Sequence, residues 1–416
     1  MKVLPQIGSR LTASTGVVVA LACAFVLLRP ATSLQRARQT PSQIDMSQKW
    51  RTAYYVPPES RVLPISAVPF SKYSHVILYA ILPVYDADTD SCTLDLTRYR
   101  VSARAAEFIN TAHDAGSRAL VSMLHDNTAA AIRTCTDPSH VVRFAVTIST
   151  FIRDYGFDGF DVDWEMGVVN SQYEQWLTSL RDAMPERLLT VAASWNQRYV
   201  LARIQDKIDQ INVAAYDADV STVRGRWRTD TAYNVALYQS SDQDWVTADS
   251  VVYYMTRDAG IKPGKLGIGL PFYARIKRGC QAGYLDAGNC AKPITGPGQV
   301  YASGNALVNP RPSIEYRDLI NSQYWALGQR VWDAPHGAQY ISYTPDNNDN
   351  AAFVSYTGVE QIQEAVRYIK SAGLGGIMMY QLAGEYLDSQ DGDDRYPLSS
   401  AMYGAWTESA APPAQH

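Results

Sequence analysis

The sequence lacks several short motifs that mark common classes of enzyme. No GxGxxG or GxxxxGK(S/T) loop follows an early predicted strand, which disfavours the nucleotide-binding folds. No GxSxG supports a serine hydrolase, and the six histidines show no metal-ligand spacing. An excess of charge is also missing, because the formal net charge is only -4. That balance argues against nucleic acid or an anionic surface as the partner, so a neutral or polymeric substrate fits better.

The N-terminus has an apolar run, but it is shorter than the roughly 20 residues that span a bilayer. Lys2 and Arg10 supply positive charge, the apolar run 16–28 follows, and residues 31–33 form a small-x-small cleavage site. We therefore expect residues 1–33 to be a signal peptide and the protein to be secreted and extracellular. The alternative is an uncleaved signal that anchors the protein in the membrane.

Cysteine is scarce, with five residues in the chain, and neither CxxC nor a Cys/His zinc spacing occurs. Cys23 lies in the signal segment, so an even number remains, which in an exported protein suggests disulfides. Cys280 and Cys290 bracket a short glycine-rich loop, so we expect them to pair. That leaves Cys92 to pair with Cys135. The alternative is four free thiols in a cytosolic enzyme.

From residue 50 onward, short apolar runs typical of strands alternate with helical periodicity. Helices are expected at positions such as Ala103–Ala115 and Val141–Tyr155, and several glycines that precede a strand have the position of a C-cap: Gly116, Gly156, Gly260 and Gly373. The expected strands are Thr52–Val56, His75–Ile81, Arg118–Leu124, Gly159–Glu165, Leu188–Ser194, Ile208–Tyr216, Leu266–Phe272 and Gly375–Leu382. Eight successive βα units predict an α/β fold, a closed (β/α)8 TIM barrel, with a doubly wound open sheet as the alternative.

One interval interrupts the alternation. From Arg275 to Ser355 the chain is rich in Gly, Pro, Tyr and Asn and contains the strand-like pieces AQYISYT and AFVSYT. We expect a small α+β insertion domain here, and the expected division of the chain is a linker at 34–49, a barrel made of 50–275 and 356–406, the insertion at 276–355, and a disordered tail at 407–416.

The run DGFDVDWE, residues 158–165, places carboxylates where a buried strand is expected. Burying an unpaired carboxylate costs several kcal/mol, so such a strand has a use beyond packing. Asp161, Asp163 and Glu165 share one face of the strand, whereas Trp164 faces the other way and is expected in the core. Like charges raise the pKa of a carboxyl group, so Glu165 is a candidate general acid near neutral pH, with Asp163 as its charged partner. A calcium or magnesium site is the alternative, but the EF-hand spacing is absent.

The same run matches the DGxDxDxE signature of family 18 glycoside hydrolases, the chitinase family. INVAAYD and GIGLPFYAR resemble the sixth- and seventh-strand segments of that family. VWDAPHGAQYISY and FVSYTGVEQIQEAVRYIKSAGLGGIMMYQL resemble the end of its inserted domain and the return to its eighth strand. The resemblance therefore extends over most of the chain that follows the signal segment.

The resemblance implies a retaining, substrate-assisted hydrolysis of β-1,4 bonds in chitin or N-acetylglucosamine oligomers. Glu165 would protonate the leaving oxygen while the 2-acetamido oxygen of the substrate attacks the anomeric carbon. Asp163 would accept a hydrogen bond from the acetamido N–H. Asp161 would share a proton with Asp163 and orient it. Tyr216 would bind the acetamido oxygen and Asp217 would contact the same sugar. No metal, organic cofactor, nucleic acid or stable protein partner is implied; the partner is an N-acetylglucosamine polysaccharide.

The sequence departs from the family pattern at three places. The third-strand SxGG is SMLH, in which Ser122 matches and residues 123–125 do not. Glu165 is followed by residues 166–167, Met-Gly, where an aromatic residue and a proline are usual, and Tyr380 stands at the position of the eighth-strand tryptophan. We expect further substrate contacts from Ser122, Tyr380, Tyr273 and Trp332. Two alternatives stay open: a non-catalytic sugar-binding protein of this fold, or a hydrolase of another acetamido polymer, such as N-glycan cores or peptidoglycan.

Overall fold

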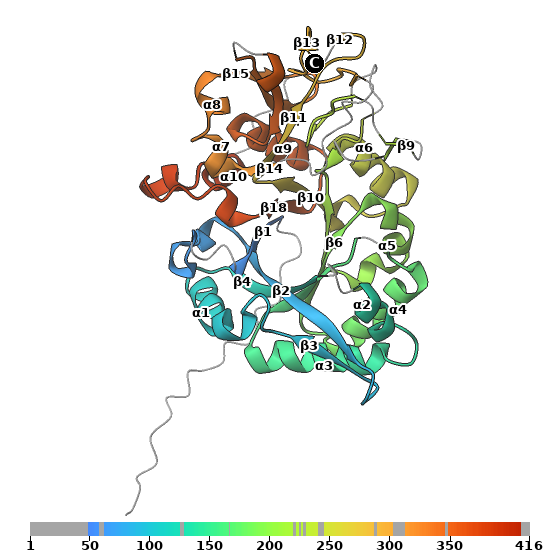
Figure 1. The fold of residues 1–416 in the computed structure, drawn as a ribbon. Coiled ribbons are helices and arrows are strands. Elements are labelled where there is room, and N and C mark those ends of the chain that lie inside the picture. The colour runs from blue at the N-terminus through green and yellow to red at the C-terminus, as the bar shows by residue number, and fades with distance from the viewer. Residues whose placement is uncertain are drawn as a thin grey trace, which may run out of the picture. The chain divides into compact units, whose positions relative to one another are not determined.

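The computed structural model describes residues 49–57, 62–124, 129–165, 167–218, 222–223, 226–227, 230–239, 245–286, 289–302, 313–345 and 348–408 (Figure 1). The predicted signal peptide, nearly all of the predicted linker and most of the predicted tail lie outside these residues, as do Cys23, His125 and Met166. No helix within the described ranges combines the length and apolar character needed to cross a membrane.

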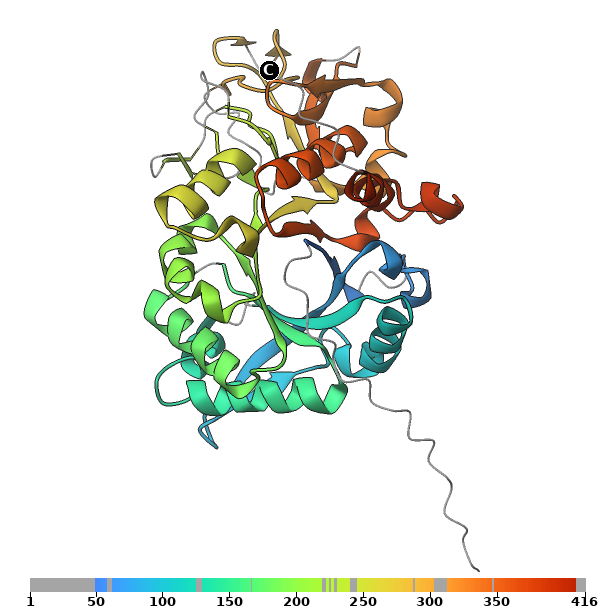
Figure 2. The same cartoon turned by 180° about the vertical axis from the view of Figure 1, so that it is seen from behind.

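Eight parallel strands form a closed barrel with helices on its outside (Figures 1 and 2). Their order in the sheet is β1-β18-β10-β7-β6-β5-β4-β2, and the pairing of β1 with β2 closes the ring. The strands are β1 (Trp50–Tyr55), β2 (His75–Asp86), β4 (Arg118–Leu124), β5 (Gly159–Asp163), β6 (Leu188–Ala193), β7 (Gln210–Ala214), β10 (Leu266–Pro271) and β18 (Gly376–Tyr380). The predicted (β/α)8 barrel is confirmed, with a strand at each of the eight expected positions.

Amphipathic helices cover the barrel because each carries one apolar stripe. In α3 (Val141–Tyr155) the buried residues recur at helical spacing, and the helix ends at Gly156, whose φ of 87° suits a residue without a Cβ. The other α-helices around the barrel are α1 (Val101–Asp114), α2 (Ala129–Cys135), α4 (Asn170–Ala183), α5 (Arg198–Ile204), α6 (Ala248–Tyr253), α9 (Val359–Ser371) and α10 (Pro397–Thr407).

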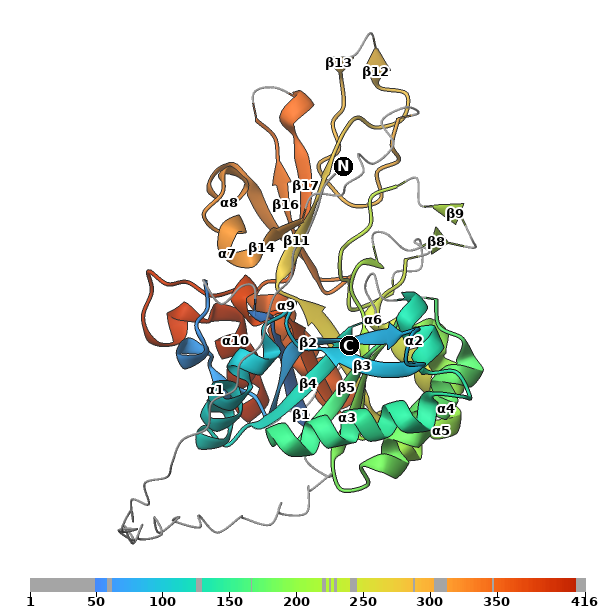
Figure 3. The same cartoon turned by 60° about the horizontal axis from the view of Figure 1, so that its bottom comes forward.

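A second, antiparallel sheet of five strands follows β10 after one intervening residue (Figure 3). Its strand order is β14-β11-β17-β16-β15. The elements are β11 (Tyr273–Arg278), β14 (Ser313–Glu315), α7 (Tyr316–Leu319), α8 (Gln323–Leu327), β15 (Gln329–Asp333), β16 (Ala338–Tyr343) and β17 (Ala352–Tyr356). Two short two-stranded pairs are also present: β8 (Thr222–Val223) with β9 (Arg226–Trp227), and β12 (Leu285–Asp286) with β13 (Asn289–Cys290).

Side chains of the barrel strands alternate between two buried layers. Tyr54 belongs to a cluster inside the barrel, whereas its neighbour Tyr55 packs outward against Phe108 of α1, with ring centroids 5.8 Å apart. Trp164 is 1% exposed and meets Trp176 of α4 at 5.9 Å. The prediction that Trp164 belongs to the core is therefore confirmed.

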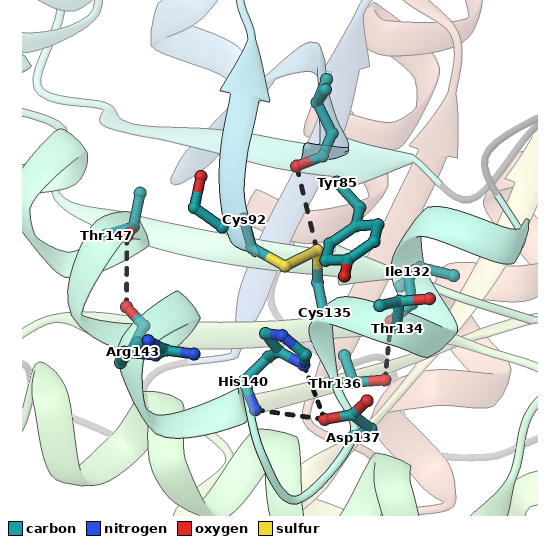
Figure 4. The surroundings of a disulfide bond; sticks show 12 residues. Tyr85, Cys92, Ile132, Thr134, Cys135, Thr136, Asp137, His140, Arg143 and Thr147 are labelled. Atoms are coloured by element: carbon teal, nitrogen blue, oxygen red, sulfur yellow. Dashed lines mark hydrogen bonds and ion pairs between the residues drawn. A yellow bond between two sulfur atoms is a disulfide. The ribbon is translucent and has the colours of Figure 1, made fainter. Parts of the chain in front are cut away.

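Both expected disulfides are present, Cys92–Cys135 and Cys280–Cys290. The first joins β3 (Ser91–Asp95), which forms a hairpin with β2, to the end of α2 (Figure 4). Beside it, His140 lies between two carboxylates, with Asp137 2.8 Å from Nδ1 and Asp90 2.9 Å from Nε2. A disulfide of this kind typically contributes about 2–4 kcal/mol to stability, so the hairpin is held firmly against the helix layer.

Candidate active site

A pocket lies at the carboxyl ends of the barrel strands, where barrel enzymes place their sites. Its lining combines carboxylates, tyrosines and two apolar side chains: Tyr54, Tyr79, Leu124, Asp163, Glu165, Ala192, Tyr216, Asp217, Tyr273 and Tyr380. Six of the residues singled out from the sequence therefore meet in this one pocket. Asp161 and Ser122 lie beneath it, and Trp332 is elsewhere.

Asp161 is fully buried and accepts hydrogen bonds from three hydroxyl groups. Its Oδ2 accepts from Tyr54 at 2.7 Å and from Ser122 at 2.8 Å, and its Oδ1 accepts from Thr190 at 2.6 Å. Burial raises the pKa of Asp161, and these hydrogen bonds act in the opposite direction. The three hydroxyls fix the position of the carboxyl group below the other two acids.

Ser122 was expected to contact the substrate, but it is 0% exposed and does not line the pocket. Its position follows from the sheet register, in which Ser122 of β4 and Thr190 of β6 are the two partners of Asp161. The geometry corrects the expectation: Ser122 lies beside Asp161 in the layer beneath the pocket and donates a hydrogen bond to it. Trp332 lies on β15 and is 38% exposed, so its contact with a longer sugar chain stays a prediction.

Strand β5 ends at Asp163, two residues before the expected end, so Glu165 extends from the loop that follows. Glu165 is partly exposed at the pocket, yet its Oε1 is buried and has no hydrogen-bond partner among the described residues. Burial, together with the negative charges of Asp217 and Asp161, raises the pKa of Glu165 to about 7. Near neutral pH this side chain can therefore carry a proton.

Asp163 shares this proton chemistry with Glu165. Burial raises the pKa of Asp163 well above its usual range, and the charges of Glu165 and Asp161 add to the effect; a hydrogen bond with Tyr79 opposes it. The sequence predicted Asp163 as the charged member of the pair, and this assignment stays a prediction. The proton belongs to the pair as a unit, because each carboxylate discourages ionisation of the other.

Asp217 connects the barrel to the antiparallel sheet. Its Oδ1 accepts hydrogen bonds from Tyr273 at 2.8 Å and from Arg275 at 2.6 and 3.0 Å. Its backbone has a φ of 57°, and its N–H donates to Asn234 Oδ1 at 3.0 Å. Arg275 and Asn234 were not expected at the site, although Arg275 ends the GIGLPFYAR segment and lies on the same face of β11 as Tyr273.

Tyrosine rings form the remaining wall of the pocket. Tyr54 meets Tyr79 edge to face at 5.8 Å, Tyr79 meets Tyr380 in the same way at 6.0 Å, and Tyr216 stacks with Tyr380 at 6.5 Å. Tyr54 and Tyr79 were missed by sequence reasoning, although strand parity was a usable signal. Aromatic faces of this kind suit the apolar faces of a sugar ring, while the hydroxyl groups remain available for hydrogen bonds.

Among the residues that the structure describes, no group of three His, Cys, Asp or Glu side chains is placed to hold a metal ion. The polar groups that line the pocket are carboxyl groups and tyrosine hydroxyls.

Solved structures of similar fold include several chitinases. Catalytic domain 2 of the group II chitinase of Ostrinia furnacalis has a TM-score of 0.68 at 19% identity, covering 88% of this chain and 98% of that chain. The class V chitinase of Nicotiana tobaccum has a TM-score of 0.66 at 19% identity, covering 87% and 99% respectively. These comparisons establish the shared fold.

Curated relatives are more similar in sequence but longer. Chitinase A1 of Niallia circulans is 29% identical over 278 residues, which cover 58% of this chain and 37% of the relative. Chitinase B of Serratia marcescens is 26% identical over 333 residues, which cover 65% of this chain and 63% of the relative. This chain thus spans less than two thirds of the length of either relative.

The family model described as Glycosyl hydrolases family 18 matches residues 51–385. That range contains the eight barrel strands apart from Trp50, the first residue of β1, together with the antiparallel sheet and every residue that lines the pocket. A match of this extent shows that the chain belongs to glycosyl hydrolase family 18.

Proposed function

We propose that this protein is a secreted glycoside hydrolase that cleaves β-1,4 bonds of chitin or N-acetylglucosamine oligomers with retention of configuration. The observation that carries the proposal is that Asp163 and Glu165 line one pocket together with Tyr216 and Asp217, while Asp161 is buried beneath it. Secretion is supported by the N-terminal signal pattern and by the two disulfides. The chitinase names of the relatives and of the similar structures agree with this substrate class.

The first step of the proposed reaction uses the proton held by the acid pair. Glu165 donates this proton to the glycosidic oxygen as the bond from that oxygen to the anomeric carbon breaks. The 2-acetamido oxygen of the sugar that contains this anomeric carbon attacks it from the opposite face. This attack forms an oxazolinium ion and releases the other part of the chain as an alcohol. Asp163 accepts a hydrogen bond from the acetamido N–H, and Tyr216 donates one to the acetamido oxygen.

The second step returns the site to its starting state. Water attacks the anomeric carbon from the face that the leaving group vacated, and the carboxylate of Glu165 takes the proton of that water. The bond between the acetamido oxygen and the anomeric carbon breaks. Two inversions give net retention, and Glu165 again carries a proton.

Product analysis tests this proposal. Incubation with N-acetylglucosamine hexamer is expected to yield shorter oligomers by mass spectrometry, and NMR of fresh products is expected to show the β-anomer first. Formation of the α-anomer first would contradict the substrate-assisted route. Binding of the hexamer without any cleavage would favour a non-catalytic sugar-binding protein, and N-glycan and peptidoglycan substrates tested in parallel would reveal another acetamido polymer.

The pH dependence of catalysis should report the acid pair. Because the pKa of Glu165 is raised to about 7, kcat/KM is expected to fall as the pH rises through that region and the proton donor is lost. The measurement uses a neutral fluorogenic chitobioside with the reaction stopped before reading, so that the pKa of the leaving phenol does not distort the profile. A decline that starts instead near the ordinary glutamate value of 4.5 would contradict the assignment.

A further inference from the structure

Asp163 has two neighbours of very different size in the sheet. Its register partner on β4 is Leu124, and its register partner on β6 is Ala192. Paired residues of parallel strands point to the same face, and both side chains line the pocket with Asp163. One layer below, Asp161 has the hydroxyl residues Ser122 and Thr190 in the same two positions. The side chain beside Asp163 is therefore large on the β4 side and small on the β6 side.

The order of the strands sets the order of polar groups around the pocket. Tyr216 and Asp217 follow β7, Ala192 lies on β6, Asp163 and Glu165 belong to β5 and its loop, and the next strand is β4. The charge interactions agree, since Asp217 acts on the pKa of Glu165 whereas Tyr79 of β2 is hydrogen-bonded with Asp163. Ala192 thus lies between Asp163 and Tyr216, and Leu124 lies on the far side of Asp163.

A sugar bound as in the proposed reaction matches this order of groups around the pocket in only one orientation. Its acetamido group must reach from Asp163, which accepts the N–H, toward Tyr216, which donates to the oxygen. That group therefore passes over the small side chain of Ala192. The anomeric carbon lies at Glu165, so the ring carbon on the other side of C2, which is C3, faces Leu124.

We infer that Leu124 is a specificity-determining residue that closes the pocket beside C3 of the sugar whose bond is cleaved. The sugar must then carry a free 3-hydroxyl, as in chitin, and a 3-O-alkylated sugar such as N-acetylmuramic acid is rejected. This inference rests on the proposed function and specifies its substrate class. Leu124 is 6% exposed and belongs to the same buried cluster as Tyr79, so its side chain is backed by packed atoms.

The test compares two neutral substrates, a fluorogenic N,N′-diacetylchitobioside and the same compound with a 3-O-propyl ether on the sugar next to the fluorophore. A propyl ether is used because the carboxylate of a lactyl ether would also be repelled by the acids of the pocket. We expect the wild-type kcat/KM for the ether to be at least about tenfold lower, since one excess methylene in a closed pocket costs about 10- to 200-fold. Leu124→Ala should raise the ratio of kcat/KM for the ether to kcat/KM for the parent substrate by at least about tenfold. Leu124→Val should raise this ratio by less.

Leu120→Ala is the matched control, because Leu120 faces the same interior cluster from the same strand but does not line the pocket. Leu120→Ala is expected to leave the ratio of the two kcat/KM values at the wild-type value. A wild-type protein that cleaves both substrates equally well, or a ratio that Leu124→Ala and Leu124→Val leave unchanged, overturns the inference while the proposed function stands. A wild-type protein that cleaves neither substrate refutes the proposed function, and the inference falls with it.

Discussion

Replacement of Glu165 by glutamine is expected to lower kcat on N-acetylglucosamine oligomers by about 10²- to 10⁴-fold, the range that a positioned general acid contributes. Glutamine keeps the size and shape of the side chain but has no proton to give to the leaving oxygen. The measurement is initial-rate kinetics on the hexamer. Glu174→Gln is the control, because Glu174 lies on α4 and pairs at the surface with Arg203 at 2.6 Å. Turnover by Glu165→Gln at the wild-type rate would remove Glu165 from the mechanism.

The same variant should be more stable than the wild type in mild alkali, which separates lost chemistry from lost folding. Folding raises the pKa of Glu165 from its ordinary 4.5 to about 7, so between these values the folded state binds more protons than the unfolded state. The carboxyl group therefore costs stability progressively as the pH rises through this window, and the full cost remains above it. Thermal unfolding should show a higher midpoint for Glu165→Gln at about pH 8 and little difference at about pH 4.

Asp163→Asn should be the next most damaging change, with an expected loss of about 10²- to 10³-fold in kcat, the range measured for one preorganised group that stabilises developing charge. Asparagine has no negative charge with which to stabilise the positive oxazolinium ion, and it cannot share a proton with Glu165. The loss should appear in kcat rather than in KM, since the charge develops only as the bond breaks. Single-turnover kinetics on the fluorogenic chitobioside measures it.

Asp158→Asn provides the contrast for Asp163→Asn within the same acidic run. Asp158 immediately precedes β5, and its carboxylate accepts a hydrogen bond from the backbone N–H of Ala119 at 2.8 Å and lies 2.7 Å from His113 Nε2. Its replacement should lower the unfolding midpoint and leave the kcat of the folded protein nearly unchanged. If Asp163→Asn behaves in this same way, the role assigned to Asp163 is wrong.

The barrel was predictable from the sequence because its signals are local. Each strand is an apolar run of the right length, and helix α3 has the expected bounds because its apolar stripe and its terminal glycine agree. The acids could also be found locally, since an apolar run with three carboxyl groups at alternating positions has no explanation in packing alone. The two disulfides followed from the small number of cysteines and their spacing.

The rest of the pocket depends on which strands become neighbours, and no local pattern contains that information. Tyr54 lines the pocket and Tyr55 does not, because a shift of one residue along a strand moves a side chain to the other face. Leu124 was noticed as a departure from the family pattern, but its relation to Asp163 needs the register between β4 and β5. The prediction that Ser122 contacts the substrate was wrong for the same reason. Ser122 lies one layer below the pocket, where it hydrogen-bonds Asp161 instead of a ligand.

The closure of the ring by β1 also determines when during folding the pocket can exist. Tyr54 of β1 lies 5.6 Å from Tyr380 of β18, so the first and last barrel strands must meet before this wall forms. Pairings between such distant segments close late and slowly, since the entropy of a long loop is lost before any contact compensates it. A growing chain that has not yet released β18 leaves β1 and β10 with unpaired edges, which are prone to pair with other chains. We therefore expect a chain synthesised only up to β18 to be prone to aggregation, and addition of β18 to pair both open edges and complete the tyrosine wall of the pocket.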